Sequence, residues 1–120
     1  MHTICETDPF LDAADEAGMS RDEIDSLVDY LAADPEAGDV MPGTGGCRKL
    51  RVRRPGKGKS GGYRVVTFFT GEHLPVFLIT VFGKGEKANL TKAERNGLAR
   101  LTKVLAETYR AKVVKVGVGT

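Results

Sequence analysis

The sequence predicts an α+β domain, in which an antiparallel sheet of three to four strands packs on an N-terminal helical hairpin and a C-terminal helix. Three observations lead to this fold class. Apolar residues recur at three- and four-residue spacing near the N-terminus, they alternate with basic residues in the middle of the chain, and helical spacing returns after residue 90. The chain has 120 residues, 41% of them apolar, so we expect a single domain over residues 1–120.

The N-terminal residues predict a short strand followed by a helix. Residues 2–6 form the weakest of the expected strands, because only Ile4 and Cys5 are available to be buried. Pro9 suits the first turn of the helix that follows, and Gly18 ends that helix.

A second helix begins at Ser20, which forms a capping box with Glu23. In this motif the two side chains accept hydrogen bonds from backbone NH groups at the helix end. The two acidic helices therefore form a hairpin, and the residues after them, 34–46, are rich in glycine and proline and are expected to be irregular. The buried stripe of the second helix consists of Ile24, Leu27, Val28 and Leu31.

Three strands are expected in the middle of the chain. In residues 48–53, Leu50 and Val52 alternate with basic residues, which is typical of a strand with one buried face. Residues 63–70 and 76–82 are rich in β-branched and aromatic side chains, as strands are, and the turn between them forms a hairpin tip.

The last helix begins at a second capping box, formed by Thr91 and Glu94. The tail, residues 113–120, is apolar but interrupted by glycine, so it either adds an edge strand or stays loose. The leucines expected on one buried side of the helix are Leu98, Leu101 and Leu105.

Charge is strongly segregated along the chain, although the net charge is only +2. Residues 1–39 hold twelve acidic residues and one base, residues 40–71 hold eight bases and no acid, and residues 72–120 hold nine bases and four acids. This pattern predicts a domain with one anionic and one cationic side, and a cationic side attracts partners that carry phosphate. The eight central bases are Arg48, Lys49, Arg51, Arg53, Arg54, Lys57, Lys59 and Arg64.

Composition disfavours several kinds of site and location. The two cysteines, Cys5 and Cys47, form no CxxC motif and have no histidine cluster beside them, so we expect no metal or other cofactor, and a reducing compartment. The histidines, His2 and His73, lie near a terminus and in a turn, and neither is expected to be catalytic. The acidic N-terminus does not resemble a secretory signal, and no apolar run approaches the roughly 20 residues of a membrane span, so a cytoplasmic location is expected.

The central bases predict a surface that binds nucleic acid. Neighbouring cations repel one another, because the screening length of about 10 Å at 0.1 M salt does not hide them, and a polyanion relieves this repulsion. For any single lysine the alternative is a solvated side chain that improves solubility. Arg64 is a special case because it lies inside an apolar strand, where it either pairs with an acid of the fold or faces an open cavity that receives a phosphate.

Several short runs of residues lie between positions 38 and 90, and it is their combined spacing that is specific. They are Gly38-Asp39-Val40, Gly43-Thr44-Gly45-Gly46, Arg48-Lys49-Leu50-Arg51-Val52, Lys57-Gly58-Lys59, Gly61-Gly62, Arg64-Val65-Val66, Phe77-Leu78-Ile79-Thr80-Val81-Phe82-Gly83-Lys84 and Glu86. Together they resemble the HigB branch of the RelE/ParE toxin superfamily, whereas the helices resemble it only in pattern.

The resemblance implies a bacterial type II toxin of a toxin-antitoxin pair, of the kind that cleaves mRNA as an endoribonuclease in the ribosomal decoding site. The implied partners are the ribosome with its mRNA, and a HigA-type antitoxin with a helix-turn-helix DNA-binding domain. Relatives have a compact sheet with helices on one side and a basic concave surface on the other. The active-site positions of the family fall on Arg64 and Lys84 and, in the loop before Arg64, on Lys57 and Lys59.

One departure from the family concerns the end of the last strand. Many HigB relatives carry tyrosine there, but this chain has Phe82, which can stack on a base and cannot transfer a proton. If a phenol is essential, the chain uses another group or is a weak enzyme. The remaining side chains expected to bind RNA are Lys49, Arg51, Arg53, Arg54 and Lys87.

RNA can be cleaved by attack of its own 2′-hydroxyl on the adjacent phosphate, which requires a base, an acid and stabilisation of a phosphorane. We expect Lys57, Lys59 or Lys84 to transfer a proton, since like charges lower the pKa of a lysine. Arg64 is expected to hold the phosphorane charge through bidentate hydrogen bonds.

Three other functions stay open at this point. A ParE-like toxin shares the fold and inhibits gyrase through protein contacts. A noncatalytic module that binds RNA or DNA is favoured if Phe82 replaces an obligatory phenol. The last alternative is an ordinary structural domain with a solvated basic face.

Overall fold

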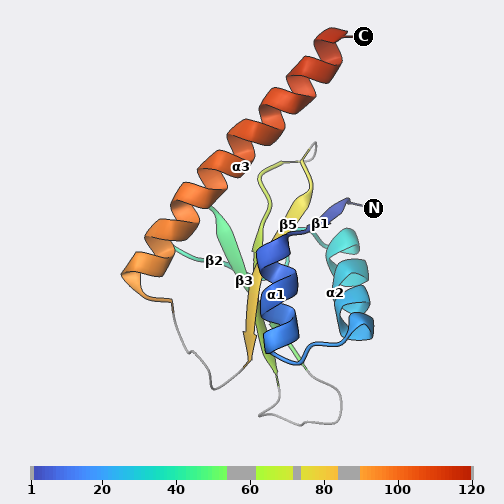
Figure 1. Ribbon diagram of the computed structural model, residues 1–120, viewed down its shortest axis with the longest axis vertical. Helices are drawn as coiled ribbons and strands as arrows, with labels where there is room; N and C mark the ends of the chain where they lie inside the picture. Colours follow the sequence, from blue (N-terminus) through green and yellow to red (C-terminus); the bar gives the residue numbers. More distant parts are fainter. Residues whose placement is uncertain (1, 54–61, 72–73, 84–89, 120) are drawn as a thin grey trace.

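The computed structural model describes residues 2–53, 62–71, 74–83 and 90–119, with the main chain alone for residues 109–119. The described residues form three helices and five strands, as the α+β prediction requires (Figure 1). In chain order the elements are β1 (Ile4–Glu6), α1 (Asp8–Glu16), α2 (Arg21–Ala33), β2 (Asp39–Val40), β3 (Cys47–Val52), β4 (Tyr63–Phe68), β5 (Val76–Gly83) and α3 (Lys92–Gly119).

The strands form one mixed sheet in the order β1-β5-β4-β3-β2. The expectation of three to four antiparallel strands was wrong in two respects, since β1 pairs in parallel with β5 and β2 is an additional strand. The parallel pair places Ile4 opposite Val76, and the Val76 amide donates to the Thr3 carbonyl oxygen (2.9 Å). Sequence periodicity cannot reveal this pairing, because it joins segments that lie more than 70 residues apart.

Strand β2 lies within the segment that was predicted to be irregular. Its two residues pair with Lys49 and Arg48 of β3. Gly38 permits this approach, because it has a φ of +95° and a Cβ atom there would come within 2.7 Å of the Lys49 carbonyl oxygen.

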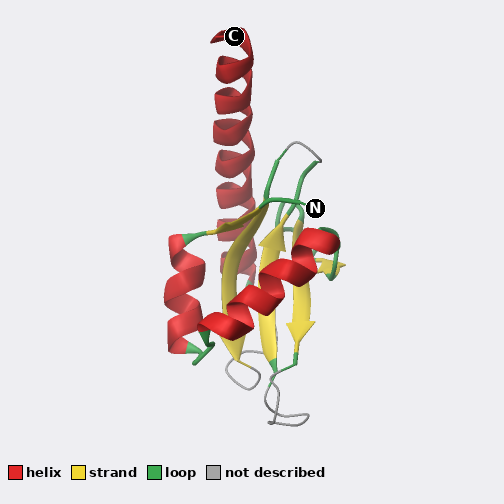
Figure 2. Cartoon of the chain, turned by 90° about the vertical axis from the view of Figure 1, so that its right-hand side faces the viewer, coloured by secondary structure: helices red, strands yellow, loops and turns green. Residues whose placement is uncertain are grey.

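Helices α1 and α2 cover one face of the sheet and bury the apolar stripe that the sequence predicts, including Ile24, Leu27 and Leu31 (Figure 2). The capping box at the start of α2 is confirmed. The Ser20 hydroxyl oxygen accepts from the Glu23 amide (3.1 Å), and a Glu23 carboxylate oxygen accepts from the Ser20 amide (2.9 Å). These helices and the sheet enclose the larger of the two apolar clusters found among the described residues.

Helix α3 lies against the opposite face of the sheet, as the two perpendicular views show (Figures 1 and 2). Its residues Leu98 and Leu105 pack on a second apolar cluster that includes Val66, Phe68 and Phe77. The arrangement with all helices on one side, which the resemblance implies, is therefore not found. The structure instead has a layer of helix on each face.

The buried side of α3 differs in detail from the predicted stripe. Leu101 is 37% exposed and Thr102 is 2% exposed, so Thr102 occupies the place expected for a leucine. The Thr102 hydroxyl lies 3.2 Å from the Thr44 carbonyl oxygen and 3.0 Å from the Ala99 carbonyl oxygen. This side of the helix is therefore held by a hydrogen bond to the loop before β3 as well as by the apolar packing of Leu98 and Leu105.

The main chain of α3 continues through Gly119, so residues 113–119 form neither the edge strand nor the loose tail that was expected. No proline interrupts the segment after the capping box, which permits the helix to continue. Within the described residues, no helix is both long and apolar enough to cross a membrane.

Candidate nucleic-acid interface

The register of the sheet places Arg51, Arg64 and Phe82 side by side. Arg51 of β3 lies opposite Arg64 of β4, and Arg64 lies opposite Phe82 of β5. Opposite residues in a sheet point to the same face, with Cβ atoms about 4.5–5.5 Å apart. These three side chains therefore form one row across three strands, on the face that carries α3.

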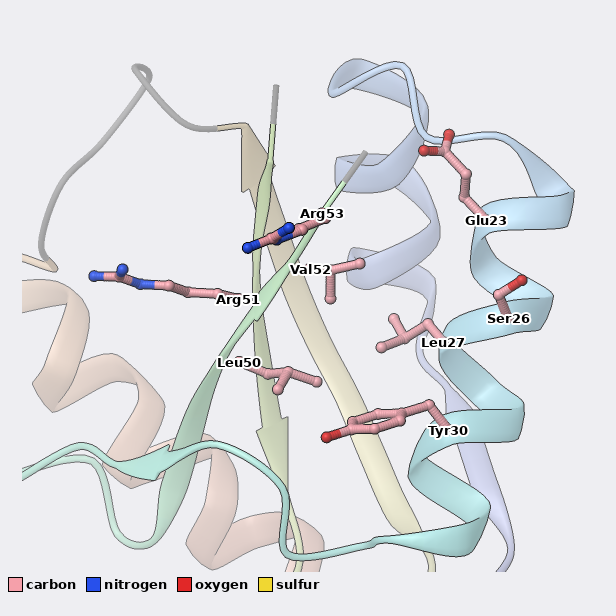
Figure 3. A pocket seen from close by; sticks show the side chains of 8 residues that line it. All are labelled: Glu23, Ser26, Leu27, Tyr30, Leu50, Arg51, Val52 and Arg53. Carbon is pink, nitrogen blue, oxygen red and sulfur yellow. The ribbon is translucent and has the colours of Figure 1, made fainter. Parts of the chain in front are cut away.

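Two further cations lie on the same face. Lys49 and Arg53 are two residues before and after Arg51, and alternate residues of a strand share a face. In Figure 3, Arg51 and Arg53 point away from α2, whereas Leu50 and Val52 point toward it. We call Lys49, Arg51, Arg53 and Arg64 the basic face.

The basic face has no carboxylate partner within the described part of the chain. The ion pairs found there join Arg21 to Glu6 and to Asp25, on the other side of the molecule. Of the two alternatives for Arg64, pairing with an internal acid is thus not found among the described residues. Arg51 and Arg53 are exposed and Arg64 is half-buried, so this positive charge is accessible to a ligand.

Arg48 belongs to the fold and not to the basic face. It lies on the opposite side of β3, and its Nη1 donates to the carbonyl oxygens of Glu36 (3.0 Å) and Gly38 (3.3 Å). This central base therefore holds the chain that leads into β2.

A cavity of about 210 Å³ adjoins the row and adds two residues that sequence reasoning missed, Asp39 and Arg95. Arg95 comes from α3, and its Nε is buried without a hydrogen-bond partner within the described residues. No local motif marks Arg95, because only the packing of α3 brings it to the sheet. The cavity is lined by Asp39, Val40, Met41, Pro42, Lys49, Phe82, Leu90 and Arg95.

Phe82 is only 8% exposed and belongs to the apolar cluster beneath α3. Since α3 covers this part of the sheet, the ring is not an open platform for a base. Any contact between Phe82 and a ligand is limited to the part of its side chain that lines the cavity.

The other expected site residues lie outside the described part of the chain. Their proposed roles in proton transfer or RNA binding therefore stay predictions. They are Arg54, Lys57, Lys59, Lys84 and Lys87.

The thiol nearest to the interface is chemically protected. Cys47 is buried on the face that carries α3, and burial raises its thiol pKa to about 11, although the hydrogen bond with Thr44 opposes this shift. A neutral, inaccessible thiol does not act as a nucleophile. Within the described residues, no three His, Cys, Asp or Glu side chains cluster closely enough to hold a metal ion.

A comparison with known families identifies the chain. The family model described as the RelE toxin of the RelE/RelB toxin-antitoxin system matches residues 31–118, which include strands β2–β5 and nearly all of α3. The match thus covers the basic face and the cavity beside it. RelE toxins pair with an antitoxin. This chain therefore belongs to the RelE toxin family and is the toxin of a toxin-antitoxin system.

Proposed function

We propose that this toxin is an endoribonuclease of the HigB branch, which cleaves mRNA on the ribosome and is neutralised by a HigA-type antitoxin with a helix-turn-helix domain. The observation that carries the proposal is the basic face, in which Arg51 and Arg64 are adjacent and have no carboxylate partner within the described residues. Adjacent guanidinium groups suit the oxygens of an RNA phosphate, because each can form bidentate hydrogen bonds.

The reaction we propose is transfer of the phosphate within the RNA. The 2′-oxygen of one ribose attacks the adjacent phosphorus, the bond from phosphorus to the 5′-oxygen breaks, and a 2′,3′-cyclic phosphate and a 5′-hydroxyl are formed. A base removes the 2′-hydroxyl proton and an acid supplies a proton to the leaving oxygen. Arg64 and Arg51 stabilise the phosphorane, whose additional negative charge lies on the nonbridging oxygens.

Proton transfer falls to lysine in this proposal. Arginine stays protonated in proteins and Phe82 has no proton to transfer. Lys57, Lys59 and Lys84 are the lysines proposed to transfer protons, and Lys49, on the basic face, is proposed to bind the RNA. Acid-base assistance contributes about 10² to 10⁴ in rate. The remaining acceleration is assigned to the ribosome, which holds the RNA in the attacking geometry.

The test uses Arg64→Ala and Arg64→Lys, with Arg100→Ala as the control because Arg100 is an exposed base of α3. Each variant is induced in a sensitive bacterium, growth is followed, and the 5′ ends of transcripts are mapped. The parent and the control are expected to arrest growth and to produce discrete new 5′ ends within codons. Arg64→Ala is expected to lose at least about 100-fold in cleavage, and Arg64→Lys to recover only part of it.

Equal growth arrest and equal cleavage by Arg64→Ala and the parent would remove the basic face from the mechanism. Growth arrest by the parent without new 5′ ends would point to a gyrase inhibitor of the ParE kind.

A noncatalytic RNA-binding function is the second candidate. It is favoured by the absence of a phenol at Phe82 and by the predominance of arginine on the basic face. This function predicts RNA binding that weakens with salt, without cleavage on translating ribosomes.

A further inference from the structure

The cavity beside the basic face combines charges of both signs. Asp39 of β2 lies opposite Lys49 of β3, so their side chains point to the same face of the sheet, and Arg95 lines the cavity from α3. Within the part of the chain that the structure describes, neither Asp39 nor Arg95 forms an ion pair. Asp39 is exposed and Arg95 is half-buried, so a ligand can reach both. The cavity therefore offers an acceptor and a donor group that no described side chain of opposite charge occupies.

The Asp39 carboxylate decides which kind of group the cavity accepts. A carboxylate in the wall repels phosphate, so the cavity differs from the basic face and does not suit an anion. Its volume of about 210 Å³ lies below the roughly 300–1,000 Å³ of sites for drug-sized ligands, so it suits a single ring system. An uncharged ring with polar edges, as in a nucleobase, meets both conditions. The apolar walls for its faces are Val40, Met41, Pro42, Phe82 and Leu90.

We propose that this cavity binds a guanine base of the RNA. Guanine presents two adjacent donors, N1–H and the N2 amino group, which pair with the two carboxylate oxygens of Asp39. Its O6 and N7 atoms accept hydrogen bonds from a guanidinium, here that of Arg95, as in the commonest base-specific contact of arginine. Adenine, cytosine and uracil each present a single donor nitrogen, so they leave one carboxylate oxygen of Asp39 without a partner.

The cavity continues into the row of side chains proposed to bind phosphate. Phe82 lines the cavity and lies opposite Arg64, and Lys49 lines the cavity two residues before Arg51. A base held in the cavity thus leaves its ribose and phosphate beside the two arginines. The cavity then selects which phosphate of the RNA these arginines receive. The inference rests on the proposed function, because it takes RNA to be the polymer bound at the basic face.

The experiment measures RNA binding by the full chain without cleavage. Short, end-labelled RNAs are fully 2′-O-methylated, which blocks the attacking oxygen, and they carry one variable base among uridines. Fluorescence anisotropy at a fixed low salt concentration gives the affinity for each RNA. The RNA with guanine is expected to bind the parent at least about tenfold more tightly than those with adenine, cytosine or uracil.

Two modified bases and two variants assign the hydrogen bonds. Hypoxanthine lacks the N2 amino group and 7-deazaguanine lacks N7, and each is expected to bind the parent about tenfold more weakly than guanine. Asp39→Asn is expected to lose the preference for guanine over hypoxanthine. Arg95→Lys is expected to lose the preference for guanine over 7-deazaguanine, because an ammonium group cannot form the bidentate contact. A side chain that only supports the fold would not separate the two modified bases in this way.

Glu36→Gln is the matched control. It removes one negative charge from an exposed side chain in the segment before β2, and Glu36 does not line the cavity. This variant is expected to bind all four RNAs slightly more tightly and to keep the preference for guanine. Circular dichroism confirms that each variant is folded, and the modified bases test the parent itself if a variant does not fold.

Four results would overturn the proposal: equal binding of the four RNAs by the folded parent, tighter binding of a base other than guanine, no binding of any of them, or an unchanged penalty for hypoxanthine in Asp39→Asn. Cleavage in cells by a parent without base preference would overturn the cavity's role alone. A guanine preference in a parent that produces no new 5′ ends would overturn the proposed nuclease function alone.

Discussion

Single residues of the interface carry charge that the fold does not neutralise within the described residues. Arg64 lies between Arg51 and Phe82 in the sheet, and Arg95 buries its Nε without a hydrogen bond to any described residue. A buried polar group without a partner costs free energy, and groups of this kind are retained where a ligand uses them. Under the proposed function, these residues lower the stability of the toxin and in return bind RNA.

Arg95→Met tests whether this side chain lowers the stability of the fold and contributes to RNA binding. Methionine keeps the long side chain and removes the unsatisfied Nε, so the free energy of unfolding is expected to rise by about 1 kcal/mol while RNA binding weakens several-fold. Urea denaturation and RNA titration measure the two effects. Arg100→Met, on the exposed side of the same helix, is the control and should change neither quantity. A less stable Arg95→Met chain would show that the guanidinium supports the fold.

Elements are joined to one another by a few defined contacts. The loop before β3 meets α3 where Gly45, with a φ of +78°, lies against the Thr102 hydroxyl. At the other end of the sheet, Arg21 of α2 donates to both carboxylate oxygens of Glu6 in β1 (2.8 and 2.6 Å). These contacts fix two elements whose places the sequence does not predict, α3 and β1.

Gly45→Ala is expected to lower the free energy of unfolding by more than about 2 kcal/mol, because it adds a left-handed backbone penalty and an overlap with the Thr102 hydroxyl. Gly43→Ala is the matched control, since Gly43 has a φ of +77° and no atom lies within 4 Å of the position that its new methyl group would take. This control should lose only about 1 kcal/mol. Equal losses in thermal or urea unfolding would show that α3 does not press on this loop.

The ion pair between Glu6 and Arg21 predicts that the stability of the fold depends on pH. The hydrogen bonds from Arg21 lower the pKa of Glu6, so its stabilising effect is present above the carboxyl's ordinary pKa and is lost as the pH falls through the lowered value. Glu6→Gln is therefore expected to be less stable than the parent at neutral pH and equally stable in strong acid. The difference should be small and should shrink with added salt, because Arg21 is exposed and Glu6 is only partly buried. A difference that persists in acid would contradict this account.

Features that depend on residues close together in the sequence, such as the capping boxes, were predicted correctly. Contacts between distant segments were not. The capping boxes at Ser20 and Thr91 depend on residues three positions apart, and the structure confirms both. The parallel pairing of β1 with β5, the place of α3 and the approach of Arg95 depend on contacts between distant segments. Alternation in β3 predicted a basic face, but only the register showed that Arg51 and Arg64 are neighbours.

At the scale of the whole molecule, charge is divided between the two faces of the sheet. The acidic helices α1 and α2 cover one face, and the basic face lies on the other. A dipolar distribution of this kind steers a polyanion toward one side of the protein. Binding of RNA should therefore depend on salt more strongly than a net charge of +2 suggests.

This dependence can be measured with single-stranded RNA. Each phosphate contact contributes about 0.7 to the slope of log K against log salt concentration. Arg51→Gln is expected to reduce the slope by about that amount. Arg48→Gln should leave the slope unchanged, because Arg48 bonds to the main chain. Equal slopes for the parent and Arg51→Gln would exclude Arg51 from phosphate contact.

The burial of Cys47 between the sheet and α3 has a practical consequence. Its thiol is both inaccessible and un-ionised at neutral pH, whereas the half-buried Cys5 lies on an edge strand. Electrophiles can modify Cys47 only after the packing of α3 on the sheet has opened. The rate at which Cys47 is modified therefore reports how often α3 separates from the sheet, close to the residues proposed to bind RNA.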